Sequence, residues 1–140
     1  MSYREKSAWL SLFAMAVAFI PYFVLTAQRA QATSLPDLSQ IGLYFKTVVV
    51  QLLILGAGHL WLRRAAPADA RLPPDERERG IERRSIQNAY YVLICSSILV
   101  GCVMPFYARG WQIVNSTILG IVIAEVVHYG SAVLSYRRQA

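Results

Sequence analysis

Four stretches of the chain are almost free of charged residues over the ~20 positions that a helix needs to cross a bilayer. They cover residues 8–28, 41–62, 88–107 and 111–135, in a chain of 140 residues that is 56% hydrophobic and 16% charged. A backbone in lipid must satisfy its own hydrogen bonds, so apolar spans of this length form helices. The sequence therefore predicts an all-α integral membrane protein, with one four-helix bundle over residues 1–140.

The first stretch also has features of a secretory signal peptide. Arg4 and Lys6 precede it, and Ala30-Gln31-Ala32 resembles a small-residue cleavage site. Its apolar run is longer than the ~7–15 residues usual for a signal peptide and contains a proline. We therefore interpret residues 8–28 as a transmembrane helix.

The positions of the basic residues predict how the chain crosses the membrane. All but three of the 14 Lys and Arg residues lie in three groups, at 4–6, 63–84 and 137–138, and the exceptions are Arg29, Lys46 and Arg109. By the positive-inside rule, both termini and the loop between the two hairpins are cytoplasmic (N-in/C-in). The net charge of +6 is then a topology signal, so lipid headgroups are the expected partner and nucleic acid is not.

The connection between the second and third stretches contains the start of a helix. Residues 65–74 are an Ala/Pro-rich segment and are predicted to be a cytoplasmic linker. Asp75 follows two prolines and precedes Glu78 by three residues, which is an Asp-x-x-Glu variant of the capping box. We expect one helix to begin at Asp75 and to run into the third span, so that the helices cover about 8–28, 41–62, 75–107 and 111–135.

The stretch DERERGIERRSIQNAYY, residues 75–91, resembles a signature of small uncharacterised bacterial inner-membrane proteins with four helices. In these proteins an Asp-Glu-Arg-[Asp/Glu] run, followed by Ile and Arg or Lys, leads into a transmembrane helix. The resemblance implies a multipass bacterial membrane protein. It implies no activity, substrate or functional residue.

Two interpretations of this charged helix stay open. It is either a solvated surface that anchors the third span at the headgroups, or a docking surface for a second subunit or a cytoplasmic partner. Arg77, Ile81 and Arg84 share one helical face, and arginines beside an apolar residue suit an acidic partner. With Asp75 and Glu76, these residues form the candidate interaction surface.

The third helix also carries a stripe of small or mildly polar side chains. At spacings of three and four this stripe comprises Ile81, Ser85, Asn88, Val92, Cys95, Leu99, Cys102 and Phe106. Helix interfaces in membranes favour such residues, so the stripe is predicted to face the bundle. The pairs Ser97/Gly101 and Gly120/Ala124 are predicted to let helix backbones approach closely.

An internal duplication would make the chain two similar hairpins. The second and fourth stretches each contain one histidine, His59 and His128, and each ends in a double arginine. If the duplication is real, the hairpins are related by a pseudo-twofold axis along the membrane normal, with the histidines at similar depth.

Glu125 and His128 interrupt the fourth stretch. A charged carboxylate at the centre of a bilayer costs ~3 kcal/mol, so Glu125 must be neutral, paired or in contact with water. At about 1.5 Å per residue, Glu125, His128, His59 and Cys95 fall in a layer roughly 10 Å thick. We call these four residues the polar layer. In the simplest interpretation, Glu125 and His128 only satisfy each other, because they lie three residues apart on one helix.

The functional interpretation is that the polar layer binds a proton, a small ligand or a metal ion. His59, Glu125 and His128 are suitable ligands for a transition metal, with Cys95 as a softer fourth ligand, whereas haem is disfavoured by the scarcity of other polar anchors. A proton-coupled carrier of four helices would have to assemble with another copy or a partner membrane protein. No triad or phosphate-binding loop is apparent, so we predict no catalytic residues. The alternative is a regulatory or scaffold subunit that acts through residues 75–85.

Overall fold

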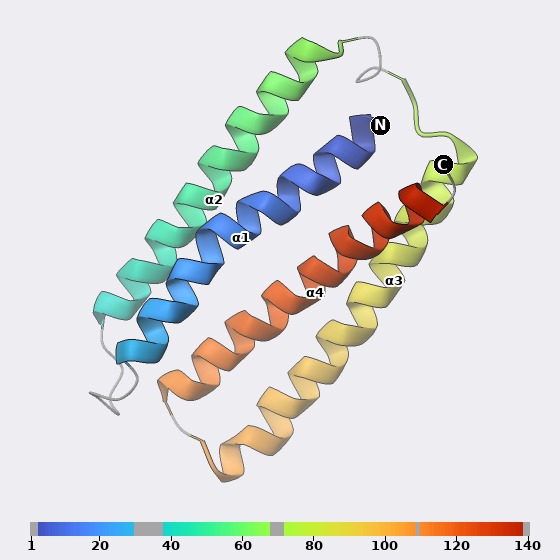
Figure 1. The fold of residues 1–140 in the computed structure, drawn as a ribbon. Helices are drawn as coiled ribbons and strands as arrows, with labels where there is room; N and C mark the ends of the chain where they lie inside the picture. Colours follow the sequence, from blue (N-terminus) through green and yellow to red (C-terminus); the bar gives the residue numbers. More distant parts are fainter. Residues whose placement is uncertain (1–2, 30–37, 68–71, 109, 139–140) are drawn as a thin grey trace.

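The computed structural model describes residues 3–29, 38–67, 72–108 and 110–138, and four long helices make up most of it (Figure 1). They are α1 (Tyr3–Arg29), α2 (Leu38–Ala65), α3 (Glu76–Ile98) and α4 (Trp111–Arg138). Each helix, with α3 extended to Phe106, is long and apolar enough to cross a membrane. The predicted all-α architecture of two helical hairpins is confirmed. The suggested cleavage site at 30–32 and part of the expected linker lie outside the described residues.

Helix α3 begins at the predicted capping box. The Asp75 carboxylate accepts a hydrogen bond from the backbone N–H of Glu76 at 2.7 Å, and the Glu78 carboxylate accepts one from the backbone N–H of Asp75 at 3.4 Å. Both bonds satisfy N–H groups that have no partner inside the helix. The juxtamembrane segment therefore continues directly into the third span, as expected.

The far end of the third span departs from α geometry around Pro105. A π-helical turn, η2 (Leu99–Val103), is followed by a 3-10 turn, η3 (Met104–Phe106). Proline has no N–H to donate and its ring crowds the carbonyl four residues earlier, so the α-helical hydrogen-bond pattern is weakened there. Gly110, with φ of 57°, then turns the chain into α4 in a conformation that favours glycine.

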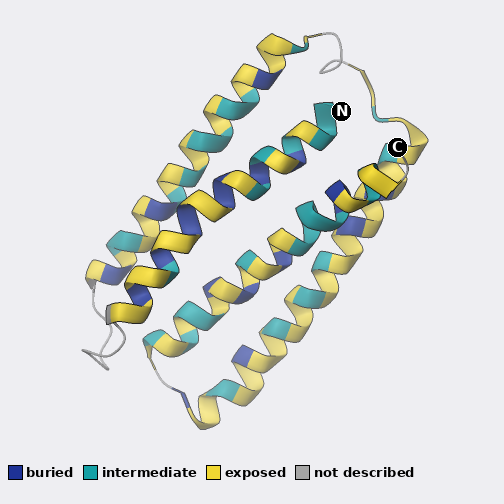
Figure 2. Cartoon of the chain, in the orientation of Figure 1, coloured by how far each residue is buried: buried dark blue, intermediate teal, exposed yellow. Residues whose placement is uncertain are grey.

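The helices lie in a row in the order α2, α1, α4, α3 (Figure 1). In the membrane-spanning windows, 39% of α1 and 28% of α4 is buried, against 6% of both α2 and α3. Figure 2 shows the same contrast, with buried positions concentrated along the two central helices. A pseudo-twofold axis between the hairpins would place α1 on α3 and α2 on α4. The α1–α4 contact would then have an equivalent contact between α3 and α2. These two helices lie at opposite ends of the row, so the described helices are not arranged about such an axis.

The two hairpins meet in a small core between α1 and α4. It contains Phe19 and Tyr22 from α1 and Ile118 from α4. The Tyr22 hydroxyl donates a hydrogen bond to Asn115 Oδ1 at 2.9 Å, and its ring lies edge-on to that of Tyr44 of α2 at 5.9 Å. Tyr22, only 1% exposed, therefore joins three helices.

The stripe predicted to pack α3 against the bundle does so only at its start. Ile81 and Ser85 are buried, but Cys95, Leu99 and Cys102 are exposed. A stripe with a repeat of seven residues drifts by about 20° per heptad on a straight helix, so it rotates away from the contact. The buried or half-buried positions leave the stripe after Val92 and continue through Ser96 and Val100.

Of the two predicted pairs of small residues, one lies at a helix contact. Gly120 and Ala124 of α4 are buried, and a Cβ atom added at Gly120 would lie 2.9 Å from both Cβ and Oγ of Ser96. Ser97 and Gly101 are exposed, and an added Cβ at Gly101 would meet nothing within 4 Å. Helices α3 and α4 therefore approach each other closely at Gly120.

Candidate functional site

Glu125 and His128 lie one turn apart on α4 and form a long ion-pair contact. The distance from Glu125 Oε2 to His128 Nδ1 is 3.8 Å, which exceeds a hydrogen bond. The Glu125 side chain is 48% exposed and the His128 side chain 25%, and the imidazole stacks on the ring of Tyr129 at 4.6 Å. The pair is close, as expected, but His128 satisfies Glu125 only partly.

His59 is held between α2 and α1. Its Nδ1 lies 3.0 Å from the Leu55 carbonyl oxygen, so this nitrogen carries the proton and donates it. Its Nε2 then accepts a hydrogen bond from the hydroxyl of Ser7 at 3.0 Å. The preceding residue, Gly58, lies so close to α1 that an added Cβ would overlap the side chain of Leu10. Both imidazole nitrogens are thus satisfied near the start of α1.

A cavity of about 220 Å³ lies between α1, α3 and α4, close to His128. Ser7 lines this cavity and also donates to His59, so one hydroxyl stands between the two histidines. The walls combine polar and apolar side chains: Arg4, Ser7, Ala8, Ile81, Glu82, Ser85, His128, Tyr129, Ala132 and Tyr136. His128 therefore lines this cavity and His59 is linked to it through Ser7, whereas Glu125 is not among the residues that line it.

A cluster of charges borders the cavity where α1 and α3 begin. Arg4 Nε lies 3.1 Å from Glu78 Oε2, and Arg4 Nη1 lies 3.8 Å from Glu82 Oε2. The same Glu78 oxygen accepts the capping hydrogen bond of Asp75. We call Arg4, Glu78 and Glu82 the Arg4 cluster. It ties the first turn of α3 to the first turn of α1, and so links the two hairpins.

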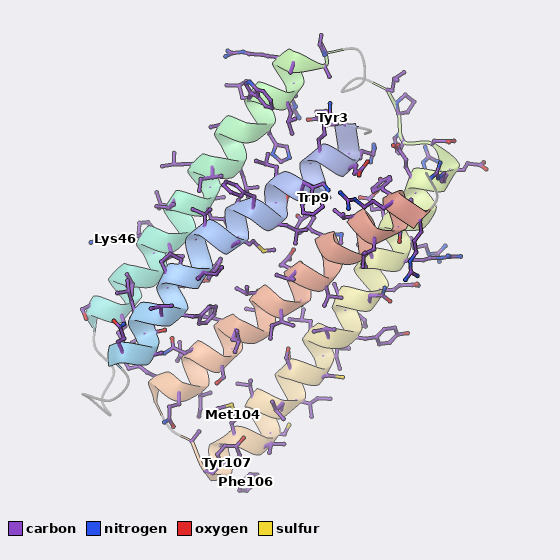
Figure 3. All side chains as sticks on the ribbon, in the orientation of Figure 1. Tyr3, Trp9, Lys46, Met104, Phe106 and Tyr107 are labelled. Carbon is purple, nitrogen blue, oxygen red and sulfur yellow. The ribbon has the colours of Figure 1, made fainter. Side chains whose placement is uncertain are left out.

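A second contact between the hairpins lies close by. The guanidinium of Arg137, near the end of α4, lies 5.5 Å from the ring centre of Trp9 of α1. Figure 3 shows Trp9 between these two helices, near the end of the molecule that carries both termini. An arginine within about 6 Å of an indole ring is attracted to its face.

The candidate interaction surface is only partly on the outside of the molecule. Asp75, Glu76, Arg77 and Arg84 are exposed, but Ile81 is 4% exposed and lines the cavity. The prediction that Ile81 forms an external contact between arginines is therefore wrong. The N-terminal segments of α1 and α3 converge there, and this convergence covers the one apolar side chain.

The other expected ligands are not brought together. Cys95 is exposed on α3, at one end of the row. Within the described residues, no group of three or more His, Cys, Asp or Glu side chains is placed to hold a metal ion. The chain by itself thus does not assemble His59, Glu125 and His128 into a metal centre.

Three residues of this site were not singled out from the sequence: Arg4, Ser7 and Tyr136. Arg4 was counted as a topology signal, Ser7 stands at the edge of the first apolar stretch, and Tyr136 adjoins the final double arginine. Their roles depend on contacts between helices. The spacing of Ser7 and Ala8 from Arg4, three and four residues, did indicate a shared helical face.

Comparisons of the chain with protein-family models, curated proteins and solved structures found no match. The resemblance of residues 75–91 therefore does not identify a family. The four long apolar helices establish a small multipass membrane protein in contact with the lipid bilayer.

Proposed function

We propose that this protein binds and releases a proton, or a small polar ligand, at Glu125 and His128, and that it acts as a proton-linked carrier or sensor. The observation that carries the proposal is the cavity in which His128 and Ser7 share a wall. Its walls combine Arg4 and Glu82 of the Arg4 cluster with apolar side chains such as those of Ala8 and Ala132. It gives water a route toward an imidazole in a membrane span.

The chemistry of the pair supports proton exchange. A carboxylate within a membrane is costly unless it is neutralised, paired or hydrated. Histidine is the side chain that ordinarily changes charge between pH 5 and 8. With Glu125 Oε2 at 3.8 Å from His128 Nδ1, a proton bound by either group stabilises the pair, and the Ser7 hydroxyl offers a link to His59.

The proposed setting is a bacterial cytoplasmic membrane, with both termini and the Arg4 cluster in the cytoplasm. The arginines at the ends of α2 and α4 and at the start of α3 support this topology. The cavity would then be hydrated from the cytoplasm.

Infrared difference spectroscopy of the protein in lipid, recorded between acid and neutral pH, tests the proposal. A carboxyl group in apolar surroundings gives a separate C=O band when it is protonated, and Glu125→Gln should remove that band. Glu82→Gln is the matched control, because Glu82 borders the same cavity at its charged end, and the variant should keep the band. A band that persists in Glu125→Gln, or no such band in the unaltered protein, contradicts proton binding at this site.

A scaffold function remains the second candidate, because Asp75, Glu76 and Arg84 are exposed on the juxtamembrane part of α3. In that case, charge reversal at Asp75 and Arg84 should abolish complex formation with a cytoplasmic partner. The double variant Glu125→Gln, His128→Ala should leave it unchanged. If proton exchange is the function, transport or signalling should be lost in the double variant Glu125→Gln, His128→Ala. It should be unchanged by charge reversal at Asp75 and Arg84.

A further inference from the structure

One side of α4 carries an exposed stripe within the membrane span. Thr117, Ile121 and Glu125 follow each other at intervals of four residues, and His128 comes three residues later, so all four share a helical face. The first three are exposed and His128 is partly exposed. We call these four residues the Glu125 stripe.

Glu125 differs from the exposed hydroxyl side chains of Thr117 and Ser97. The hydroxyl of Thr117 donates to the carbonyl of Ile113 at 2.9 Å, and that of Ser97 donates to the carbonyl of Leu93 at 2.7 Å. Each of these hydroxyl groups therefore donates its hydrogen bond within its own helix, and the side chain can face lipid. A carboxylate only accepts hydrogen bonds, and a helix interior has no free N–H groups to offer.

The ion-pair contact of Glu125 within the described residues is with a histidine, at the outer limit of such a contact. His128 Nδ1 lies 3.8 Å away, and the carboxylate remains 48% exposed. Glu125 is also absent from the residues that line the cavity, so it lies beyond the polar walls. A charged side chain that faces the hydrocarbon costs ~3 kcal/mol or more, and a hydrogen-bond donor from another molecule would offset that cost.

We propose that a second copy of this chain covers the Glu125 stripe. In this dimer, Glu125 accepts a hydrogen bond from His128 of the partner subunit, and the reverse bond forms at the same time. The stripe is suited to another copy because it holds an acceptor and a donor one turn apart. A twofold contact needs a surface that is complementary to itself in this way.

The geometry of a membrane dimer is consistent with this pairing. Two copies inserted with the same topology are related by an axis along the membrane normal, so their α4 helices run parallel and Glu125 lies at one depth in both. Three residues of helix separate Glu125 from His128 by roughly 4.5 Å along the axis, within side-chain reach at the usual interaxial distance of 8–10 Å. Thr117 and Ile121 continue the contact toward the start of α4.

The proposal depends on the membrane location of Glu125 and not on proton exchange. A dimer with a static Glu–His pair would keep this interface and give no pH-dependent infrared band. The two tests can therefore fail separately.

Disulfide cross-linking in native membranes tests the interface. In a background with Cys95→Ser and Cys102→Ser, Ile121→Cys places a thiol on the Glu125 stripe, and Ile123→Cys is the matched control. The two isoleucines are 46% and 45% exposed, but they lie on opposite sides of α4. A disulfide needs Cα atoms within about 7 Å, so we expect about tenfold more cross-linked dimer from Ile121→Cys than from Ile123→Cys.

Adding Glu125→Gln or His128→Ala to Ile121→Cys should reduce the cross-linked fraction. As an independent measurement, two differently tagged copies of the otherwise unaltered protein should purify together, and the double variant Glu125→Gln, His128→Ala should weaken this association. Equal cross-linking at positions 121 and 123, cross-linking of Ile121→Cys only to another protein, or failure of the tagged copies to associate would overturn the proposal.

Discussion

Glycine 120 sets the distance between α3 and α4, because Ser96 occupies the space that a side chain would need. An added Cβ would lie 2.9 Å from Ser96 Cβ, an atom that cannot move without its backbone. We therefore expect Gly120→Ala to lower the free energy of unfolding by about 1–3 kcal/mol, the usual cost of overpacking. Unfolding in detergent, followed by circular dichroism, measures this change.

Gly130→Ala is the control on the same helix. Nothing lies within 4 Å of an added Cβ at Gly130, and alanine is favoured over glycine in a helix by up to about 1 kcal/mol. The control variant should be as stable as the unaltered protein or slightly more stable. If both alanine variants have the same stability, Gly120 is not a close contact.

The individual polar residues differ in whether their contacts could be predicted from the sequence. Glu125 and His128 were predictable, because polar residues inside an apolar span are conspicuous and a separation of three residues fixes their proximity. The partner of His59 was not, because Ser7 belongs to another helix and a serine near a helix start has many ordinary roles. Depth along a helix places side chains in one layer, but it does not say which helices are neighbours.

Among the elements, the start of α3 contains one residue, Glu78, that takes part in two interactions. Glu78 accepts the capping hydrogen bond of Asp75 and also pairs with Arg4 of α1. We expect Asp75→Ala to destabilise the first turn of α3 by about 1 kcal/mol, because an N-cap acceptor is lost. Hydrogen exchange of the amides at 76–78 should become several-fold faster, as measured by mass spectrometry.

Glu76→Ala is the matched control for the cap. Glu76 is an exposed acid in the same turn, and its side chain takes no part in the capping box. Its removal should change exchange at these amides much less than Asp75→Ala does. Equal acceleration in both variants would assign the effect to charge in the first turn instead of to the cap.

The helices themselves were predictable, since their length, apolar character and capping residues are local properties. The contact face of α3 was not, because a small rotation per turn accumulates along a long helix. The stripe from Ser85 to Cys102 therefore begins against α4 and ends exposed. A π-helical turn precedes Pro105, whereas Pro21 lies inside a helix that remains α-helical, so the presence of a proline alone does not predict the distortion.

At the scale of the whole molecule, the start of α1 and the end of α4 lie at the same end of the bundle along the helix axes, together with the arginine-rich ends of α2 and α4 (Figure 1). Phe106 and Tyr107 lie at the other end (Figure 3). In a background without the native cysteines, Phe106→Cys should react in intact cells with a membrane-impermeant maleimide, and Arg84→Cys should not. Phe106 is 89% exposed, so its reactivity reports the side of the membrane.

Permeabilised cells provide the control for this topology, because both cysteines should then react. Labelling of Arg84→Cys in intact cells, with Phe106→Cys protected, would invert the proposed orientation. Labelling of both in intact cells would show that the chain inserts in both directions.

The arrangement of the helices in one row also leaves this molecule with little interior of its own. With 6% of the spans of α2 and α3 buried, their side chains meet more of their surroundings than of their own chain. Most of the packing that a water-soluble protein of this length obtains from itself must here come from acyl chains and from other proteins. The thickness and composition of the bilayer therefore contribute to the folding free energy of this chain. The same sequence should have a different stability in a different membrane.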